Sequence, residues 1–139
     1  MSSETVRLAS LGLGWWSDEL ADAVGRAEGV KITACFTRSR DKREEFAKKY
    51  DCYAASSYDE ILADSEIDGI INTTPNNVHL ETTRKAAEAG KHIFLDKPIA
   101  NTVAEGLEIT RICRDANVRL SIGFQRRRDS DSGGQICPP

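Results

Sequence analysis

The sequence lacks the features that mark membrane, secreted and nucleic-acid-binding proteins. No apolar run approaches the length of a membrane span. The N-terminal stretch MSSETVRLASLGLGWW has neither the basic start nor the long apolar stretch of a signal peptide. Basic charge is not in excess, since 19 Lys and Arg residues stand against 22 Asp and Glu. We therefore predict a cytoplasmic protein with no membrane and no nucleic acid among its partners.

Cysteine is scarce, and no two cysteines form a C-x-x-C pair. The four lie far apart, at Cys35, Cys52, Cys113 and Cys137. This spacing favours neither a disulfide framework nor a metal site. Cys35 and Cys113 each fall within an apolar pattern, so we expect them to be buried and reduced.

Internal repeats are also absent, and 139 residues suffice for one hydrophobic core but not comfortably for two. Short apolar runs alternate with amphipathic stretches. Strands are predicted at 6–13, 30–37, 52–55, 68–74, 92–96 and 119–124, and helices at 17–28, 41–50, 57–65, 78–90 and 102–117. This alternation predicts an α/β fold, a doubly wound parallel sheet of the Rossmann type with strand order 3-2-1-4-5-6. Ligands of such sheets bind at the carboxyl ends of the strands where the order reverses.

The character of the chain changes after Phe124. Residues 125–139, QRRRDSDSGGQICPP, are polar, contain glycine and proline, and have no periodicity. We predict a single domain over residues 1–124, followed by a loosely attached polar tail over 125–139.

The turn after the first strand carries the motif GLGWWS. Gly12 suits a tight turn, and Gly14 would let a pyrophosphate approach the backbone at a helix N-terminus. Ser17 stands where dinucleotide-binding loops have a third glycine; we expect it to allow close helix packing and to cap the helix. Trp15 and Trp16 are expected to pack beside a cofactor or against a neighbouring segment. An ordinary turn is the alternative, because G-x-G matches are common.

The second strand ends without an acidic residue. NAD-preferring sites usually carry an acid there, which binds the 2′-hydroxyl of the adenosine ribose. Here Thr37, Arg38 and Ser39 occupy the segment, and Arg40 precedes the first acid, Asp41. An arginine among hydroxyls suits a 2′-phosphate, so we predict NADP as the preferred cofactor, with NAD possible. The alternative is that the two arginines are solvated loop charges.

Three further motifs, in order, resemble those of a known family. The segment after the fourth strand reads Thr74-Pro75-Asn76-Asn77-Val78-His79, the following helix ends in Ala89-Gly90-Lys91-His92, and the fifth strand ends in Asp96-Lys97-Pro98. They resemble the T-P-N-x-x-H, A-G-K-H and E-K-P motifs of the glucose–fructose oxidoreductase, inositol dehydrogenase and rhizopine catabolism protein family (Gfo/Idh/MocA). The resemblance is to its N-terminal domain and covers about residues 5–128.

The resemblance implies an oxidoreductase that transfers hydride between NAD(P) and a hydroxyl-bearing carbon, commonly of a sugar or polyol. Thr74, Pro75 and Asn76 would line the nicotinamide ribose side of the groove, with His79 starting the helix behind it. Lys97 is similar to the family lysine that touches the reacting hydroxyl, and is the candidate catalytic residue. Such a lysine can polarise the substrate oxygen or move its proton. The peptide before the following proline is cis in some members.

Two departures from the family pattern limit what it implies. Asp96 replaces the family glutamate and shortens a side chain that normally approaches the cofactor. The family's substrate domain is absent, so we expect the chain to be inactive alone unless a longer protein or a partner supplies that half. Without that domain we expect a monomer or weak dimer, or self-association through the uncovered face.

The same residues also fit other functions. The chain could be a non-catalytic nucleotide-binding or interaction module. A phosphoryl-accepting receiver domain is disfavoured, because the first strand is not followed by clustered acids. His79 suits a hydrogen-bonded helix-start residue better than a catalytic one, and His92 even more so. Asn76 and Asn77 could be only a turn and a cap.

Overall fold

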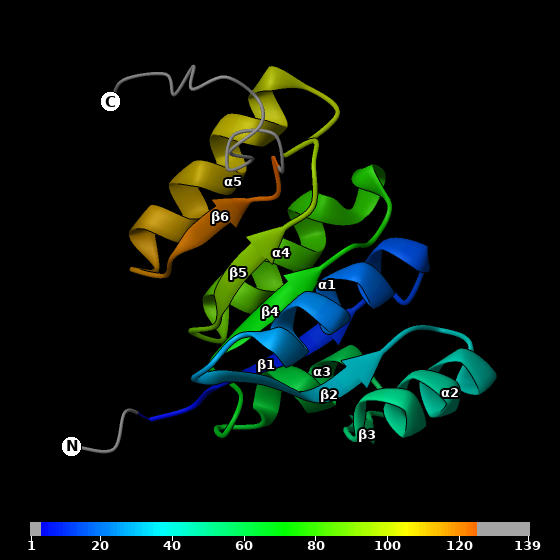
Figure 1. The fold of residues 1–139 in the computed structure, drawn as a ribbon. Coiled ribbons are helices and arrows are strands. Elements are labelled where there is room, and N and C mark those ends of the chain that lie inside the picture. Colours follow the sequence, from blue (N-terminus) through cyan, green and yellow to red (C-terminus); the bar gives the residue numbers. More distant parts are fainter. Residues whose placement is uncertain (1–3, 125–139) are drawn as a thin grey trace, which may run out of the picture.

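A computed structural model describes residues 4–124. Six parallel strands form one sheet in the order β3-β2-β1-β4-β5-β6, which confirms the predicted fold (Figure 1). The strands are β1 (Val6–Leu11), β2 (Val30–Phe36), β3 (Tyr53–Ala54), β4 (Gly69–Asn72), β5 (His92–Leu95) and β6 (Leu120–Ile122). The order reverses between β1 and β4, which pair with each other. A crevice for a ligand is expected at their carboxyl ends.

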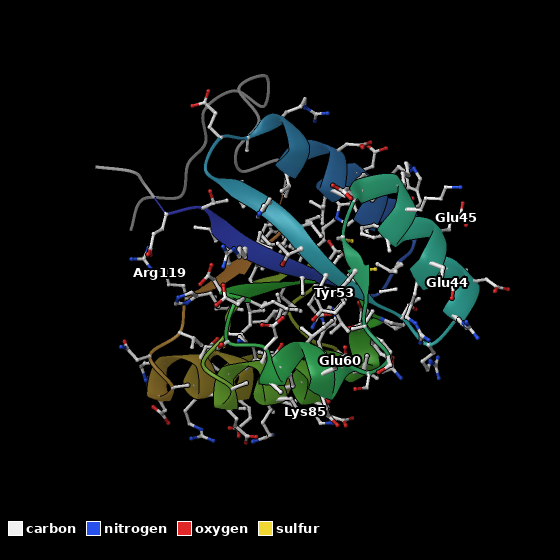
Figure 2. The ribbon with its side chains drawn as sticks, turned by 90° about the horizontal axis from the view of Figure 1, so that it is seen from below. Glu44, Glu45, Tyr53, Glu60, Lys85 and Arg119 are labelled. Atoms are coloured by element: carbon white, nitrogen blue, oxygen red, sulfur yellow. The ribbon has the colours of Figure 1, made fainter. Side chains whose placement is uncertain are left out.

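Helices cover both faces of the sheet, as Figure 2 shows in a view along its layers. They are α1 (Trp15–Arg26), α2 (Arg40–Tyr50), α3 (Tyr58–Ala63), the short 3-10 helix η1 (Asn76–Val78), α4 (His79–Glu88) and α5 (Val103–Asp115). Apolar residues of α1 and α2 pack against one face of the sheet. Those of α3, α4 and α5 pack against the other face.

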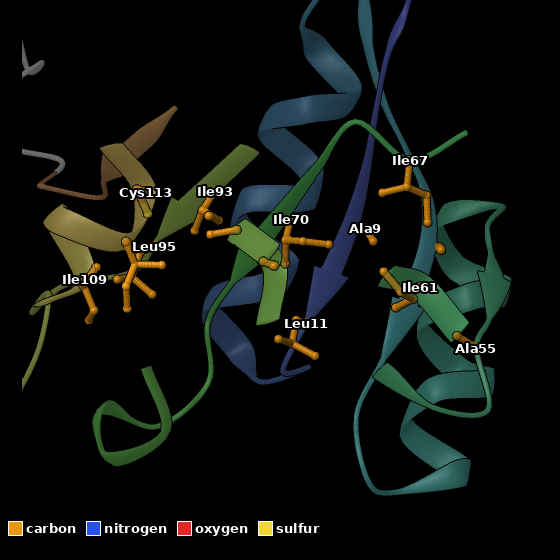
Figure 3. Packing of buried hydrophobic residues seen from close by; sticks show 14 residues of the cluster. Ala9, Leu11, Ala55, Ile61, Ile67, Ile70, Ile93, Leu95, Ile109 and Cys113 are labelled. Carbon is orange, nitrogen blue, oxygen red and sulfur yellow. The ribbon is translucent and has the colours of Figure 1, made fainter. Parts of the chain in front are cut away.

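The larger core cluster lies between the sheet and α3, α4 and α5 (Figure 3). Ile61, Ile70, Leu95 and Ile109 meet there, and each is at most 1% exposed. Burying side chains of this size supplies most of the favourable free energy of folding. The core is therefore built mainly from the isoleucines and leucines of the predicted strands and helices.

The cysteines within the described residues are free thiols. Cys35 and Cys113 are buried, as predicted. A hydrogen bond with Cys52 and burial raise the pKa of the Cys35 thiol, and burial raises the pKa of Cys113. Both side chains therefore act as small apolar groups in the core.

The first helix begins earlier than the sequence predicts. It starts at Trp15, with Gly14 as its N-cap, so the predicted capping role of Ser17 is wrong. Ser17 lies inside the first turn, where its hydroxyl donates to the carbonyl of Gly14 at 2.6 Å instead of accepting from a free N–H. The helix also ends at Arg26, which leaves Ala27 outside its apolar face.

Several other boundaries differ in detail. The third strand has only two residues, and the predicted strands at 68–74 and 119–124 are shorter by their outer residues. Not all apolar residues of α5 face the core. Val103 and Leu107 are 80% and 67% exposed, whereas Ile109 and Ile112 are buried. The expected tail at 125–139 lies outside the described residues. Within the described range, no helix is long and apolar enough to cross a membrane.

Candidate functional site

The loop between β1 and α1 is fixed by contacts to both neighbouring strands. Gly12 has φ +80°, and a Cβ there would lie 3.0 Å from the backbone C of Thr73 and N of Thr74. Its N–H donates to the carbonyl of Phe36 at 3.0 Å, and the Thr73 hydroxyl donates to its carbonyl. A side chain at this position would force the loop away from the turn after β4, so glycine is required here.

Gly14 faces open space. A Cβ at this residue would meet no atom within 4 Å, and its backbone is in an ordinary extended conformation. As the N-cap of α1 it has no side chain to satisfy the N–H groups of the first turn. The helix dipole adds partial positive charge at the same point. An anion with several oxygens, such as a pyrophosphate, fits these features.

An acid in the first turn of α1 is bonded to the neighbouring helix. Asp18 accepts a hydrogen bond from the Tyr50 hydroxyl at 2.9 Å and pairs with Lys49 at 3.4 Å. Both partners belong to α2. The charge of the carboxylate is therefore balanced by the neighbouring helix, which limits its repulsion of an anion at the helix start.

The two tryptophans of the loop lie in different surroundings. The Trp15 side chain is 74% exposed, whereas Trp16 is half-buried. Trp16 lines a hollow of about 250 Å³ together with Phe94 and Phe124. Its indole Nε1 is buried with no hydrogen-bond partner among the described residues. Both predicted roles of the tryptophans, packing beside a cofactor or against a neighbouring segment, stay predictions.

At the end of β2, the charged side chains differ in how firmly they are held. Arg43 donates to the carbonyl of Thr37 at 3.0 Å, and Arg40 pairs with Glu44 at 2.8 Å (Glu44 is labelled in Figure 2). Ser39 caps α2 by accepting from Lys42 N at 3.4 Å. Arg38 is exposed and forms no ion pair within the described part of the chain. Its guanidinium is therefore available to a ligand.

The turn after β4 rests on a buried amide that the sequence reasoning missed. Asn72 is 1% exposed, and its Oδ1 accepts from the N and Oγ1 of Thr74 at 3.1 and 2.6 Å. Its Nδ2 donates to the Thr82 hydroxyl at 2.7 Å. The available signal was a polar residue closing the otherwise apolar strand GIIN. Asn72 thus fixes the conformation of Thr74 through these hydrogen bonds. Pro75 and Asn76, next along the turn, are exposed.

The end of β5 presents Lys97 to solvent. Asp96 N donates to the carbonyl of Asn72 at 2.9 Å, which ties this segment to the turn after β4. The Asp96 Oδ1 accepts from Lys97 N at 2.9 Å, so the carboxylate supports its own turn. The side chain of Lys97 is exposed and forms no ion pair among residues 4–124. The Lys97–Pro98 peptide is cis.

His79 is fully buried beneath these two turns. Its Nε2 lies 2.8 Å from the carbonyl oxygen of Thr74, and its Nδ1 lies 3.1 Å from that of Pro98 and 3.3 Å from that of Ile99. Its exposed fraction is 0%. The ring is hydrogen-bonded at the start of α4, as the sequence favoured, and connects the two turns.

Most of the residues singled out by sequence therefore gather at one edge of the sheet. The turn at 73–79 contacts both the loop at 12–17 and the segment at 96–99, and the loop also bonds to the end of β2. The motif Ala89-Gly90-Lys91-His92 lies elsewhere, at the start of β5. His92 is at the opposite end of β5, where its Nδ1 accepts from Arg119 N at 3.0 Å, and Lys91 donates to the carbonyls of Asp64 and Ile67.

Known proteins support this description. The model of an oxidoreductase family with an NAD-binding Rossmann fold (Gfo/Idh/MocA) matches residues 6–124. An uncharacterised oxidoreductase of Streptococcus pneumoniae is 35% identical over 118 residues, which are 85% of this chain and 32% of that protein. The scyllo-inositol 2-dehydrogenase (NADP(+)) IolW of Bacillus subtilis is 30% identical over 132 residues, covering 92% of this chain and 36% of the relative.

A solved structure gives the same result. The NAD-binding protein from Listeria innocua superposes with a TM-score of 0.85 at 28% identity, over 89% of this chain and 35% of that chain. The chain thus spans about a third of the length of the relatives that it matches.

Proposed function

Because this chain belongs to the Gfo/Idh/MocA oxidoreductase family through its NAD-binding Rossmann domain, we propose that it binds NADP in preference to NAD at the carboxyl edge of the sheet. The observation that carries the proposal is the uncapped start of α1, where Gly14 leaves open space for a pyrophosphate. Gly12 holds the loop in place, and Ser17, 1% exposed, packs beneath it.

The preference for NADP is supported by the end of β2. Thr37, Arg38 and Ser39 occupy the place where an acid would favour NAD. Arg38 is exposed without an ion pair among the described residues, and it precedes the N-terminus of α2. A guanidinium and a helix start together suit the 2′-phosphate of NADP.

The nicotinamide end of the cofactor would lie against the turns after β4 and β5. We assign Thr74, Pro75 and Asn76 to the ribose side of the groove, and Asp96 and Lys97 to cofactor contacts at the end of β5, where Lys97 also faces substrate. A bound nicotinamide cofactor supplies or accepts a hydride. Lys97, exposed at this edge, would hold the substrate oxygen and exchange a proton with it.

The substrate class is proposed from a relative. IolW is named as an inositol dehydrogenase. A hydroxyl-bearing carbon of a polyol or sugar fits the proposed site, because Lys97 can exchange a proton with that hydroxyl. The residues that select the substrate would come from polypeptide outside these 139 residues, in a longer protein or a partner. A cytoplasmic location stays a prediction, and the three free thiols within residues 4–124 support it.

A second candidate function is nucleotide binding without turnover. It is favoured by the burial of His79 and by the use of the Asp96 carboxylate inside its own turn. Turnover of a polyol by the purified chain would exclude this function. Binding of the cofactor without turnover would support it.

The proposal is tested by titrating the chain with NADP and NAD while following the fluorescence of Trp15 and Trp16. We expect tighter binding of NADP, and we expect Arg38→Ala to weaken NADP binding about tenfold or more while leaving NAD binding unchanged. Arg40→Ala is the matched control, because Glu44 already holds that guanidinium. Failure of both cofactors to bind would overturn the proposal, and tighter binding of NAD would overturn the assigned preference.

A further inference from the structure

The imidazole of His79 is surrounded by hydrogen-bond acceptors from two separate turns. Thr74 O lies 2.8 Å from Nε2, and Pro98 O and Ile99 O lie 3.1 and 3.3 Å from Nδ1. The ring is 0% exposed, so no solvent competes for these contacts. A ring with one N–H donates to the carbonyl of one turn and lies in polar contact with the other turn, so the buried ring is wedged between the two backbones.

The two turns are the ones assigned to the nicotinamide half of the cofactor site. Thr74 opens the turn after β4, and Pro98 directly follows Lys97. Before Lys97, the Asp96 N–H is bonded to the carbonyl of Asn72 at 2.9 Å. After it, the contact between His79 Nδ1 and the Pro98 carbonyl is the next tie to the turn after β4. Lys97 is thus bracketed by one main-chain bond and by His79.

We infer that His79 is a positioning residue, which fixes the separation of the Thr74 and Lys97 turns and so shapes the nicotinamide half of the site. This inference rests on the proposed function. It assigns His79 no contact with the cofactor, because the ring is fully buried and its polar contacts are with backbone carbonyls. His79 has polar contacts with Thr74, Pro98 and Ile99 and with neither Gly14 nor Arg38, so the adenosine half should depend on it less than the nicotinamide half does.

Three substitutions of His79 distinguish its contact with Thr74 from its contact with Pro98. His79→Leu removes both polar contacts. His79→Gln retains a donor near the Nε2 position, facing Thr74, and His79→Asn retains one near the Nδ1 position, facing Pro98. His92→Leu is the matched control, since that histidine lies at the opposite end of β5.

The test compares NADPH with 2′,5′-ADP, a fragment that has the adenosine half of the cofactor and no nicotinamide. We expect His79→Leu to weaken NADPH binding about tenfold while changing the affinity for the fragment less than about twofold. His79→Gln and His79→Asn should fall between wild type and His79→Leu, and His92→Leu should match wild type. The nicotinamide fluorescence of bound NADPH should shift in the same order, which a general loss of stability would not produce.

The outcomes are distinguishable. If wild type binds neither ligand, the proposed function fails and the inference with it. If wild type binds both, the inference fails when the His79 variants bind NADPH as wild type does, or when they lose NADPH and the fragment in equal proportion. Circular dichroism checks folding, and if His79→Leu does not fold, the Gln and Asn variants decide by the same criteria.

Discussion

Two glycines of one loop, Gly12 and Gly14, are subject to different constraints. Gly12 combines φ +80° with backbone atoms 3.0 Å from where a Cβ would be. Gly14 has neither restriction. The first is needed to fold the loop, and the second is needed, on our proposal, only when a pyrophosphate arrives.

We therefore expect alanine to affect folding stability at Gly12 and cofactor binding at Gly14. Gly12→Ala should lower the free energy of unfolding by about 2–4 kcal/mol, because the new Cβ is both strained and blocked by backbone. Gly14→Ala should lower it by no more than about 1 kcal/mol, the cost of alanine at an N-cap, but should weaken NADP binding. Urea denaturation and fluorescence titration measure the two effects. Equal stability of the two variants would contradict this explanation.

At the scale of elements, a buried lysine joins segments that are distant in sequence. Lys91 precedes β5, is 5% exposed, and donates from its ammonium to Asp64 O at 2.6 Å and Ile67 O at 2.7 Å. Both carbonyls belong to the connection between α3 and β4. A buried ammonium needs such partners, and these carbonyls in turn need a donor.

Replacing Lys91 should destabilise the connection between α3 and β4. Lys91→Met keeps most of the apolar stem but removes the lysine donor from both carbonyls, of which Asp64 O keeps only the N–H of Ile67 at 3.2 Å, so we expect a loss of about 1–3 kcal/mol in the free energy of unfolding. Lys85→Met is the control, because Lys85 (labelled in Figure 2) is exposed and lies 3.9 Å from Asp59. That change should stay within about 0.5 kcal/mol. Chemical denaturation of both variants measures the difference, and similar losses would count against a structural role for Lys91.

At the scale of the whole molecule, buried acidic groups predict an alkaline limit to stability. Burial raises the pKa of Tyr58, whose hydroxyl donates to Thr82 O at 2.7 Å, and burial raises the pKa of Cys113. The folded state thus holds these protons to higher pH than the unfolded state. Their contribution to stability is present below the unfolded pKa values, near 8.5 for Cys and 10 for Tyr, and is lost as the pH rises above them.

We expect the free energy of unfolding to fall above about pH 9, by up to about 1.4 kcal/mol per pH unit for each such group. Denaturation at pH 7, 9, 10 and 11 measures this slope. Tyr58→Phe should be less stable than wild type at pH 7, since it loses a hydrogen bond, but should show a shallower slope above about pH 10. If the free energy of unfolding falls equally steeply with pH in both proteins, Tyr58 does not contribute to the alkaline loss of stability.

Local patterns in the sequence determined the order of the elements and the approximate location of the site. Alternating apolar runs and amphipathic stretches suffice to predict a doubly wound sheet, because few topologies accommodate them. The glycine loop, the Arg38 segment and the motif around Lys97 all follow predicted strands, and parallel strands bring their carboxyl ends to one edge.

Only the tertiary structure decided how those segments hold one another. The start of α1 at Trp15, the buried amide of Asn72 and the bridge formed by His79 depend on atoms brought together across the sheet. Periodicity along one strand or helix carries no information about such contacts, because they join residues that become neighbours only when the strands pair. The sequence thus determined which residues reach the edge of the sheet, and the packing beneath that edge decided which face the groove and which support it.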